Sequence, residues 1–343
     1  MPRKPFVRLR ASVLGLALVV SLGSVSGQEV KAAASTPLQP AQIIDTLKVV
    51  NIVPDFLSFW TAAESKDETT QVRMFRQLVM QPHPELFVGN VVNLGQKQGT
   101  AEEDRRIATA LKQIRPLVPV IRVLNDRLQS ELKTYIPNFV RVFPDYRPST
   151  PVYFTISLGH FNGAARDVDG QNALLFGVDV IAQDGPDANV SVLFDHELFH
   201  QYHASLKLPQ SDDAGQLWQS LWAEGLATYV SWRMNPSVDE NDVLFDTTLA
   251  DRARPLLPAL AADLLLNLRS KDPGEYDKYF LGNGTDKNIP GRSGYFVGFL
   301  VASRLGQSST PLALAHLHGP ELRSQIEQTL KSLSTPPLPQ NHQ

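Results

Sequence analysis

A glutamate that follows the first of two histidines four positions apart constrains this chain more than any other feature. The segment reads Asp195-His196-Glu197-Leu198-Phe199-His200. Residues four apart on a helix lie on the same face, so both imidazoles can reach one metal ion. A carboxylate next to the first histidine then lies beside a metal-bound water, where a general base is needed. The spacing predicts a helix that carries a metal site, with Glu197 as the base.

The surrounding residues also favour a helix. Asp187 or Asn189 can cap a helix that continues to about Leu206, with Pro209 beyond its end. Apolar residues at positions 190, 193, 194, 198 and 202 would form its buried side.

Two polar neighbours of the motif have expected roles. His203 would lie near the metal side, as a neighbour of the ligands or a substrate-facing group. It is not expected to be a ligand, because a fourth protein ligand would close the position that a catalytic zinc leaves open. Asp195 would accept a hydrogen bond from a ligand imidazole or face solvent.

A third ligand is expected on a second helix. The segment from Gln216 to Met234 has amphipathic spacing, and Glu224 is its only acidic residue. Its apolar face is formed by Trp218, Leu221, Trp222, Leu226, Tyr229 and Val230. A lone carboxylate among apolar side chains is costly unless a cation or hydrogen bonds satisfy it. Glu224 therefore completes a His-His-Glu zinc site with His196 and His200, the alternative being a partly exposed helix glutamate.

The two motifs together resemble the gluzincin metallopeptidases, in which a second helix carries the third-ligand glutamate. The segment Leu221-Trp-Ala-Glu-Gly-Leu-Ala-Thr-Tyr-Val is similar to the corresponding pattern of the thermolysin-related aminopeptidases. The chain departs from those aminopeptidases in two ways: it has 23 residues between His200 and Glu224, and it lacks their Gly-x-Met-Glu-Asn motif. It more closely resembles bacterial families described as predicted secreted zinc-dependent proteases, as far as Gly294-Tyr-Phe-Val-Gly298.

This resemblance implies a zinc peptidase in which Glu197 is the general base. It also implies that Tyr295 donates a hydrogen bond to the oxyanion, since Arg292-Ser-Gly-Tyr lies at an expected loop-to-helix junction. Core packing of Tyr295 is the alternative. By analogy with thermolysin-like enzymes, the expected strand from Ala173 to Ile181 would bind substrate backbone by β-addition.

The N-terminus predicts export. Four cations and no acidic residue precede an apolar run from Ala11, and small residues follow up to Gly27, which is the pattern of a secretory signal at residues 1–27. Cleavage there removes those four cations and takes the net charge from −3 to −7. We therefore expect a secreted or periplasmic protein with no stable membrane insertion and no nucleic-acid partner. The absence of cysteine excludes disulfides and thiolate metal sites.

Pattern and composition along the chain predict an α+β fold. A flexible leader is expected at 28–40, a mostly helical N-terminal region at 41–150 and a disordered tail at 334–343. Prolines, Pro137 among them, are expected to break the helical region into pieces. The zincin-like catalytic domain, 151–333, would contain a short sheet, with strands at 152–159 and 173–181 separated by a loop at 159–171, and the active-site helix pair.

The expected activity is hydrolysis of a peptide or protein substrate by a metal-activated water. Two other classes stay open. One is a non-catalytic zinc-binding interaction protein, although metal binding alone has no use for the base Glu197. The other is a metallohydrolase that acts on a non-peptide amide or a cell-wall cross-link.

Overall fold

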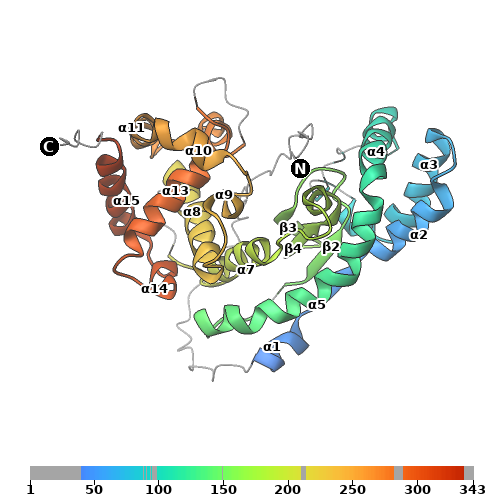
Figure 1. The fold of residues 1–343 in the computed structure, drawn as a ribbon, viewed down its shortest axis with the longest axis horizontal. Helices are drawn as coiled ribbons and strands as arrows, with labels where there is room; N and C mark the ends of the chain where they lie inside the picture. Colours follow the sequence, from blue (N-terminus) through green and yellow to red (C-terminus); the bar gives the residue numbers. More distant parts are fainter. Residues whose placement is uncertain are drawn as a thin grey trace, which may run out of the picture. The chain divides into compact units, whose positions relative to one another are not determined.

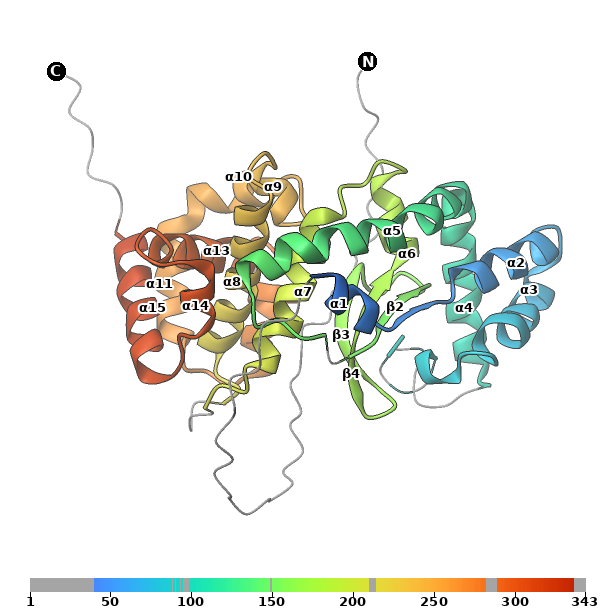
Figure 2. The same cartoon turned by 90° about the horizontal axis from the view of Figure 1, so that it is seen from below.

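The computed structural model describes residues 40–335 except 88, 90, 93, 95–98, 149, 210–213 and 282–288. The predicted signal segment, most of the predicted leader and residues 336–343 of the predicted tail lie outside the described residues. Helices predominate in the described chain, together with one small sheet, and this confirms the α+β class (Figures 1 and 2).

The chain divides into two compact units. The first unit contains Thr46–Glu131 and Ser149–Val190, and the second contains Leu132–Pro148, the chain from Ser191 onward and residues 40–45. Helix α5, Val118–Val142, has residues in both units. All four strands belong to the same unit as the helices of residues 46–131.

The first unit contains a four-stranded sheet in the order β1-β2-β4-β3. Its strands are β1 Val49–Asn51, β2 Val152–Thr155, β3 Gly163–Val168 and β4 Gln171–Gly177. β1 and β4 both pair in parallel with β2, and β3 pairs antiparallel with β4. Asp169 and Gly170, both with positive φ, form the two-residue turn of the β3–β4 hairpin.

Two sequence-based expectations for this region were wrong. The predicted loop 159–171 contains strand β3, and the predicted strand 173–181 ends at Gly177, where the short helix α6, Val178–Ile181, begins. Moreover, β4 is hydrogen-bonded on both sides, so its backbone offers no free edge for β-addition of a substrate.

Side-chain caps start two helices of the first unit, and aromatic rings pack two of its helices together. They include α2 Val53–Ala63, α3 Glu68–Phe75 and α4 Ala101–Ile114. Asp67 accepts a hydrogen bond from the Thr70 N–H at the start of α3, and Thr100 caps α4 in the same way. The buried rings of α2 and α3 are those of Phe56, Phe59, Trp60 and Phe75.

The expectation that every proline breaks the helical region was wrong at one position. Pro137 lies inside the 25-residue helix α5, which continues to Val142. In the second unit, the buried rings of Phe139 on this helix and of Phe143, directly after its end, pack around Tyr202. Tertiary packing of this kind can outweigh the lost backbone hydrogen bond of a proline.

The second unit is helical. Its elements are α1 Pro40–Thr46 up to residue 45, α7 Ser191–Ser205, α8 Leu217–Met234, α9 Glu240–Val243, α10 Leu249–Ala253, α11 Leu257–Asn267, α12 Pro273–Tyr276, α13 Ser293–Leu305, α14 Pro311–Ala315 and α15 Gly319–Leu333. Both predicted motif helices are present as α7 and α8.

Helices α8 and α13 touch through their backbones (Figures 1 and 2). A Cβ built on Gly225 of α8 would lie 2.2 Å from the Gly298 carbonyl carbon of α13. A Cβ built on Gly298 would lie 2.5 Å from the Leu221 carbonyl oxygen. Only glycine fits at either position, and the pair fixes how α13 lies against the helix that carries Glu224.

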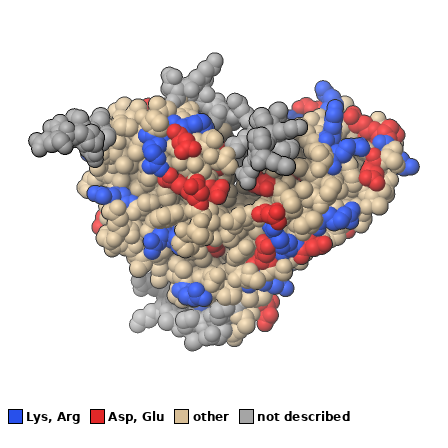
Figure 3. Space-filling view, in the orientation of Figure 1, with Lys and Arg blue, Asp and Glu red and all other residues tan. Residues whose placement is uncertain are grey.

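In the part of the chain that the structure describes, no helix has both the length and the apolar character of a membrane span. On the face shown in Figure 3, acidic and basic side chains are interspersed.

Candidate metal centre

Helices α7 and α8 bring the three predicted ligands together. His196 and His200, one turn apart on α7, have their Nε2 atoms 3.0 Å from each other. The Glu224 Oε2 atom of α8 lies 3.5 Å from His196 Nε2 and 3.3 Å from His200 Nε2. Among the described residues, these three form the one group of His, Asp and Glu side chains whose donor atoms could hold a metal ion.

The spacing of these donors fits a tetrahedral zinc site. Zinc binds imidazole nitrogen and carboxylate oxygen at about 2.0–2.2 Å, and tetrahedral angles then place two ligand atoms about 3.3–3.5 Å apart. The three observed separations, 3.0, 3.3 and 3.5 Å, lie around this value. The set supplies two nitrogens and one carboxylate oxygen, which is the donor set of a catalytic zinc with one position open. The separations and the chemical types of these donor atoms therefore fit a zinc ion.

Because the cluster is buried, the pKa of each of its side chains is set mainly by burial and by the charges of the other two. Glu224 is only 7% exposed. Burial would raise the pKa of this carboxyl, but the two histidines outweigh it and hold the pKa well below its usual value. Burial likewise lowers the pKa of His200, yet Glu224 outweighs it and raises that pKa to about 9. His196 has its pKa lowered to about 4, mainly by burial. An ionised glutamate thus lies beside a protonated His200 and a neutral His196, and a bound metal would have to displace the His200 proton.

Glu197 lies next to the cluster but is not one of its three donors. It is 7% exposed, and burial raises its pKa to about 7, with Glu224 adding to the rise and His200 opposing it. A carboxylate whose pKa lies near neutrality can take up and release a proton in turn. This is the property that a general base needs.

Asn235, which follows α8, connects that helix to α7. Its side-chain N–H donates to Asp195 Oδ2 at 2.8 Å, and its Oδ1 accepts from the Ser191 hydroxyl at 2.6 Å. Ser231 of α8 also donates to the Val192 carbonyl of α7 at 2.7 Å. These bonds hold the two ligand-bearing helices in register.

Both expectations for Asp195 were wrong. The residue is 3% exposed, so it does not face solvent, and it accepts from Asn235 rather than from an imidazole. His196 Nδ1, the atom that would donate to it, is buried without a hydrogen-bond partner in the described structure. Asp195 therefore helps to hold α7 against α8, and burial raises its pKa to about 7.

His203 is not one of the three side chains whose donor atoms cluster. Its ring stacks on Phe199 at 5.4 Å and 19°, and it is hydrogen-bonded to the Ala315 backbone. Its Nε2 atom is buried and has no partner among the described residues. The ring of Phe245 packs edge-on against the His196 ring, with 5.5 Å between the ring centres.

Tyr295 lies in the first turn of α13 and is 3% exposed. Its ring packs edge-on against Phe280 at 5.6 Å. Burial raises the pKa of its hydroxyl well above the usual value, and the negative charges of Glu224 and Glu197 contribute to this rise. Tyr295 is thus within electrostatic range of both glutamates, while its ring is packed. The two alternatives left open by the sequence are therefore compatible.

Sequence analysis missed two further polar groups near the cluster, Tyr276 of α12 and Arg292 at the start of α13. The Tyr276 ring stacks on Phe280 at 5.0 Å and 22°, and its hydroxyl is buried without a partner in the described structure. The Arg292 guanidinium carbon lies 4.6 Å from the centre of the Tyr295 ring. The sequence showed Arg292 only as part of the segment before Tyr295, and Tyr276 belongs to no motif, so only the folded chain brings the two together.

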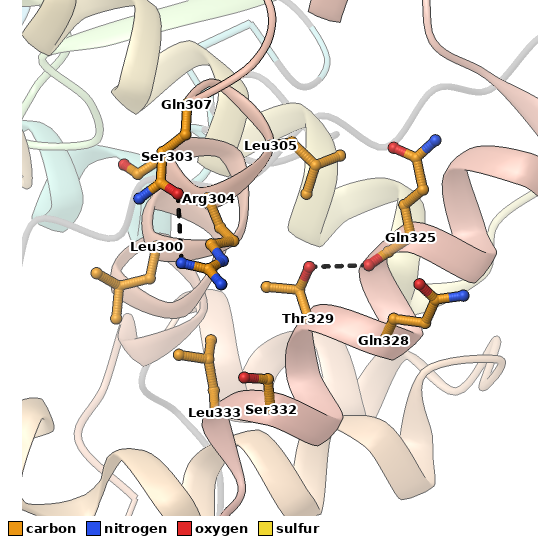
Figure 4. Close-up of a pocket in the computed structure, with 10 residues that line it drawn as sticks. All are labelled: Leu300, Ser303, Arg304, Leu305, Gln307, Gln325, Gln328, Thr329, Ser332 and Leu333. Carbon is orange, nitrogen blue, oxygen red and sulfur yellow. Dashed lines mark hydrogen bonds between the residues drawn. The ribbon is translucent and has the colours of Figure 1, made fainter. Parts of the chain in front are cut away.

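A cavity of about 620 Å³ lies elsewhere in the second unit, between α13 and α15 (Figure 4). Arg304 and Gln307 face each other across a 3.3 Å hydrogen bond, and Thr329 donates to the Gln325 carbonyl at 2.9 Å. The residues that line this cavity do not include His196, His200 or Glu224.

Comparisons with protein-family models, curated proteins and solved structures found no match to this chain.

Proposed function

We propose that this protein is a zinc-dependent peptidase of the gluzincin type, with a zincin-like catalytic domain. The observation that carries the proposal is the tetrahedral spacing of His196, His200 and Glu224 beside a buried carboxyl group, Glu197. Zinc, when bound there, would polarise the substrate carbonyl and lower the pKa of water toward 7.

In this proposal, Glu197 moves the proton. Its carboxylate takes a proton from the attacking water and delivers it to the nitrogen of the leaving amine. The pKa of about 7 that burial gives Glu197 suits both transfers, because neither the charged nor the neutral form is strongly favoured. A site that only bound metal would have no use for this group.

Tyr295 is the proposed donor to the oxyanion. Its hydroxyl lies within electrostatic range of Glu197 and Glu224. A high pKa keeps the hydroxyl protonated, so that it can donate. The packing of its ring against Phe280 would hold it in place before the charge develops.

The test separates metal binding from catalysis. Elemental analysis of the purified protein should find about one zinc per chain, by the three-ligand logic. Glu197→Gln should keep the zinc and lose hydrolysis of a mixed peptide library read by mass spectrometry. Glu224→Ala should lose zinc affinity. Glu102→Gln, at an exposed glutamate on α4, is the control and should behave as wild type.

The outcomes have different meanings. A protein that binds no transition metal, even after zinc is added back, would remove the basis of the proposal. A protein that holds zinc but cleaves no peptide would instead favour a zinc-binding interaction protein or a hydrolase of another amide.

We also infer that the protein is exported to the periplasm or beyond. The support is the signal-like pattern of residues 1–27 in the sequence. N-terminal sequencing of protein recovered from a bacterial host should then start near Gln28, and intact Met1 in the cytoplasm would contradict it.

A further inference from the structure

A second group of polar side chains lies beside the metal cluster, and the proposed chemistry does not use it. It consists of Arg292 and Tyr276, which come from different elements of the second unit. Phe280 and Tyr295 connect them. The Phe280 ring stacks on Tyr276 and packs edge-on against the Tyr295 ring. The Arg292 guanidinium lies over that same Tyr295 ring. The group is therefore continuous with the proposed oxyanion donor.

Among the residues that the structure describes, Arg292 has no anionic partner. In the described structure its guanidinium has no ion pair, its Nε atom is buried without a hydrogen bond, and its side chain lies against the Tyr295 ring. Its backbone is left-handed, with φ of 67°, which is uncommon for a residue with a side chain. Such conformations cost free energy, and they cluster at functional sites.

Tyr276 supplies a hydroxyl that also lacks a partner within the described part of the chain. The oxygen is buried, although a buried hydroxyl normally forms a hydrogen bond. Burial raises the pKa of Tyr276, the charge of Glu224 adds to this rise, and the charge of Arg292 opposes it. The hydroxyl thus lies within electrostatic range of both the metal ligand and the guanidinium. The charge of Arg292 also acts on His196, where burial has the larger effect.

We propose that Arg292 and Tyr276 form a subsite that binds a carboxylate group of the substrate beside the metal centre. A guanidinium binds a carboxylate through two parallel N–H bonds, and the Tyr276 hydroxyl offers a further donor. A half-buried cation and a buried hydroxyl, both unsatisfied among the described residues, become satisfied together when an anion binds. This inference rests on the proposed function for its choice of substrate.

A peptide can present such a carboxylate in two ways. One is its free C-terminus, in which case the protein removes residues from the C-terminal end. The other is an aspartate or glutamate side chain near the scissile bond, in which case it cleaves within chains next to acidic residues. Both use the same recognition chemistry, so the probes must distinguish them.

The direct test is binding without hydrolysis. Isothermal titration of metal-free protein would use three probes: N-acetyl-Phe-Ala with a free carboxylate, its C-terminal amide, and N-acetyl-Phe-Glu amide. Either the free acid or the Glu amide should bind about tenfold or more tightly than the uncharged amide, because the amide lacks the charge-assisted contact. Whichever charged probe is preferred identifies the source of the carboxylate.

Four variants test whether Arg292 and Tyr276 cause the preference for a carboxylate-bearing probe. Arg292→Gln should remove it, Arg292→Lys should restore part of it, and Tyr276→Phe should weaken it. Arg304→Gln is the matched control, since Arg304 is an exposed arginine near the other end of α13 and bonds Gln307. Circular dichroism would show that each variant is folded.

Equal affinity for all three probes, or a preference that persists in folded Arg292→Gln protein, would overturn the inference. This result is independent of the proposed function. Zinc-dependent peptide cleavage combined with equal affinity for the three probes would leave the peptidase proposal standing while the carboxylate subsite falls. A carboxylate preference in a protein without hydrolytic activity would leave the subsite standing while the peptidase proposal falls.

Discussion

Gly225→Ala should destabilise the protein, although alanine is the better helix former. By intrinsic helix propensity alone, the change would stabilise α8 by about 1 kcal/mol. The structure predicts the opposite sign, because the new Cβ would lie 2.2 Å from the Gly298 carbonyl carbon, 2.4 Å from its oxygen and 2.5 Å from its Cα. The test therefore depends on whether the free energy of unfolding rises or falls, and not on a small difference in its size.

The size of the effect follows from the contact. Carbon atoms normally approach to about 3.5–4.0 Å, so the two backbones would have to separate by more than about 1 Å. All three clashing atoms are backbone, so no side-chain rotation can relieve the overlap. Overpacking costs about 1–3 kcal/mol and sometimes more. Taking the upper end and subtracting the propensity gain leaves a loss of about 2 kcal/mol in the free energy of unfolding.

The assay is guanidinium unfolding followed by circular dichroism, combined with a zinc-affinity measurement. Gly225 is next to Glu224, so separation of α8 from α13 should also displace the third donor and weaken zinc binding. Ser220→Ala, at a half-buried position on the same helix, should leave the midpoint unchanged or slightly raised. A Gly225→Ala protein as stable as wild type, or more stable, would refute the backbone contact between α8 and α13.

Two further predictions concern the chemistry of the site. Tyr295→Phe should lower kcat and kcat/KM together by about 100-fold, with zinc content unchanged, because the lost hydrogen bond forms only in the transition state; near-normal turnover would assign Tyr295 to core packing alone. Zinc binding at pH 7 should release a proton, because Glu224 outweighs burial and raises the pKa of His200 to about 9, so the metal-free imidazole is protonated. Calorimetry in two buffers of different ionisation enthalpy would measure that proton, and a zinc affinity that does not fall as the pH falls from 9 to 6 would contradict it.

The two helices that carry the candidate donors were predictable because their patterns are long and periodic. Sequence analysis expected a helix from about residue 190 to Leu206 and a second from Gln216 to Met234, and the structure has Ser191–Ser205 and Leu217–Met234. His196 and His200 share a face through helical spacing alone. That Glu224 meets them depends on tertiary packing, which the sequence indicated by a lone acid among apolar residues and by the resemblance of its segment to the gluzincin third-ligand pattern. Their binding of zinc stays a prediction.

Strand β3 was missed because its own residues do not favour a strand. Gly163–Val168 contains glycine, alanine, arginine and aspartate, and its pairing with the apolar strand β4 determines its conformation. The signal that could have found it is the pair Asp169-Gly170, which is typical of a two-residue hairpin turn. The prediction for Asp195 was wrong for a similar reason, because its carboxylate accepts a hydrogen bond from Asn235, which is 40 residues away in the sequence.

The segment Gly294-Tyr-Phe-Val-Gly298 has a physical explanation in the structure, and it connects the fold to the site. Gly298 allows α13 to touch the backbone of α8. Gly294 leaves room for Phe280, since a Cβ there would lie 2.7 Å from the Phe280 ring. Phe280 in turn packs against both Tyr276 and Tyr295. Two glycines four residues apart thus position α13 against the helix that carries Glu224 and against Phe280, whose ring packs on Tyr295 of α13 and on Tyr276 of α12. A larger residue at either glycine would move the proposed donor or its support without touching a metal ligand.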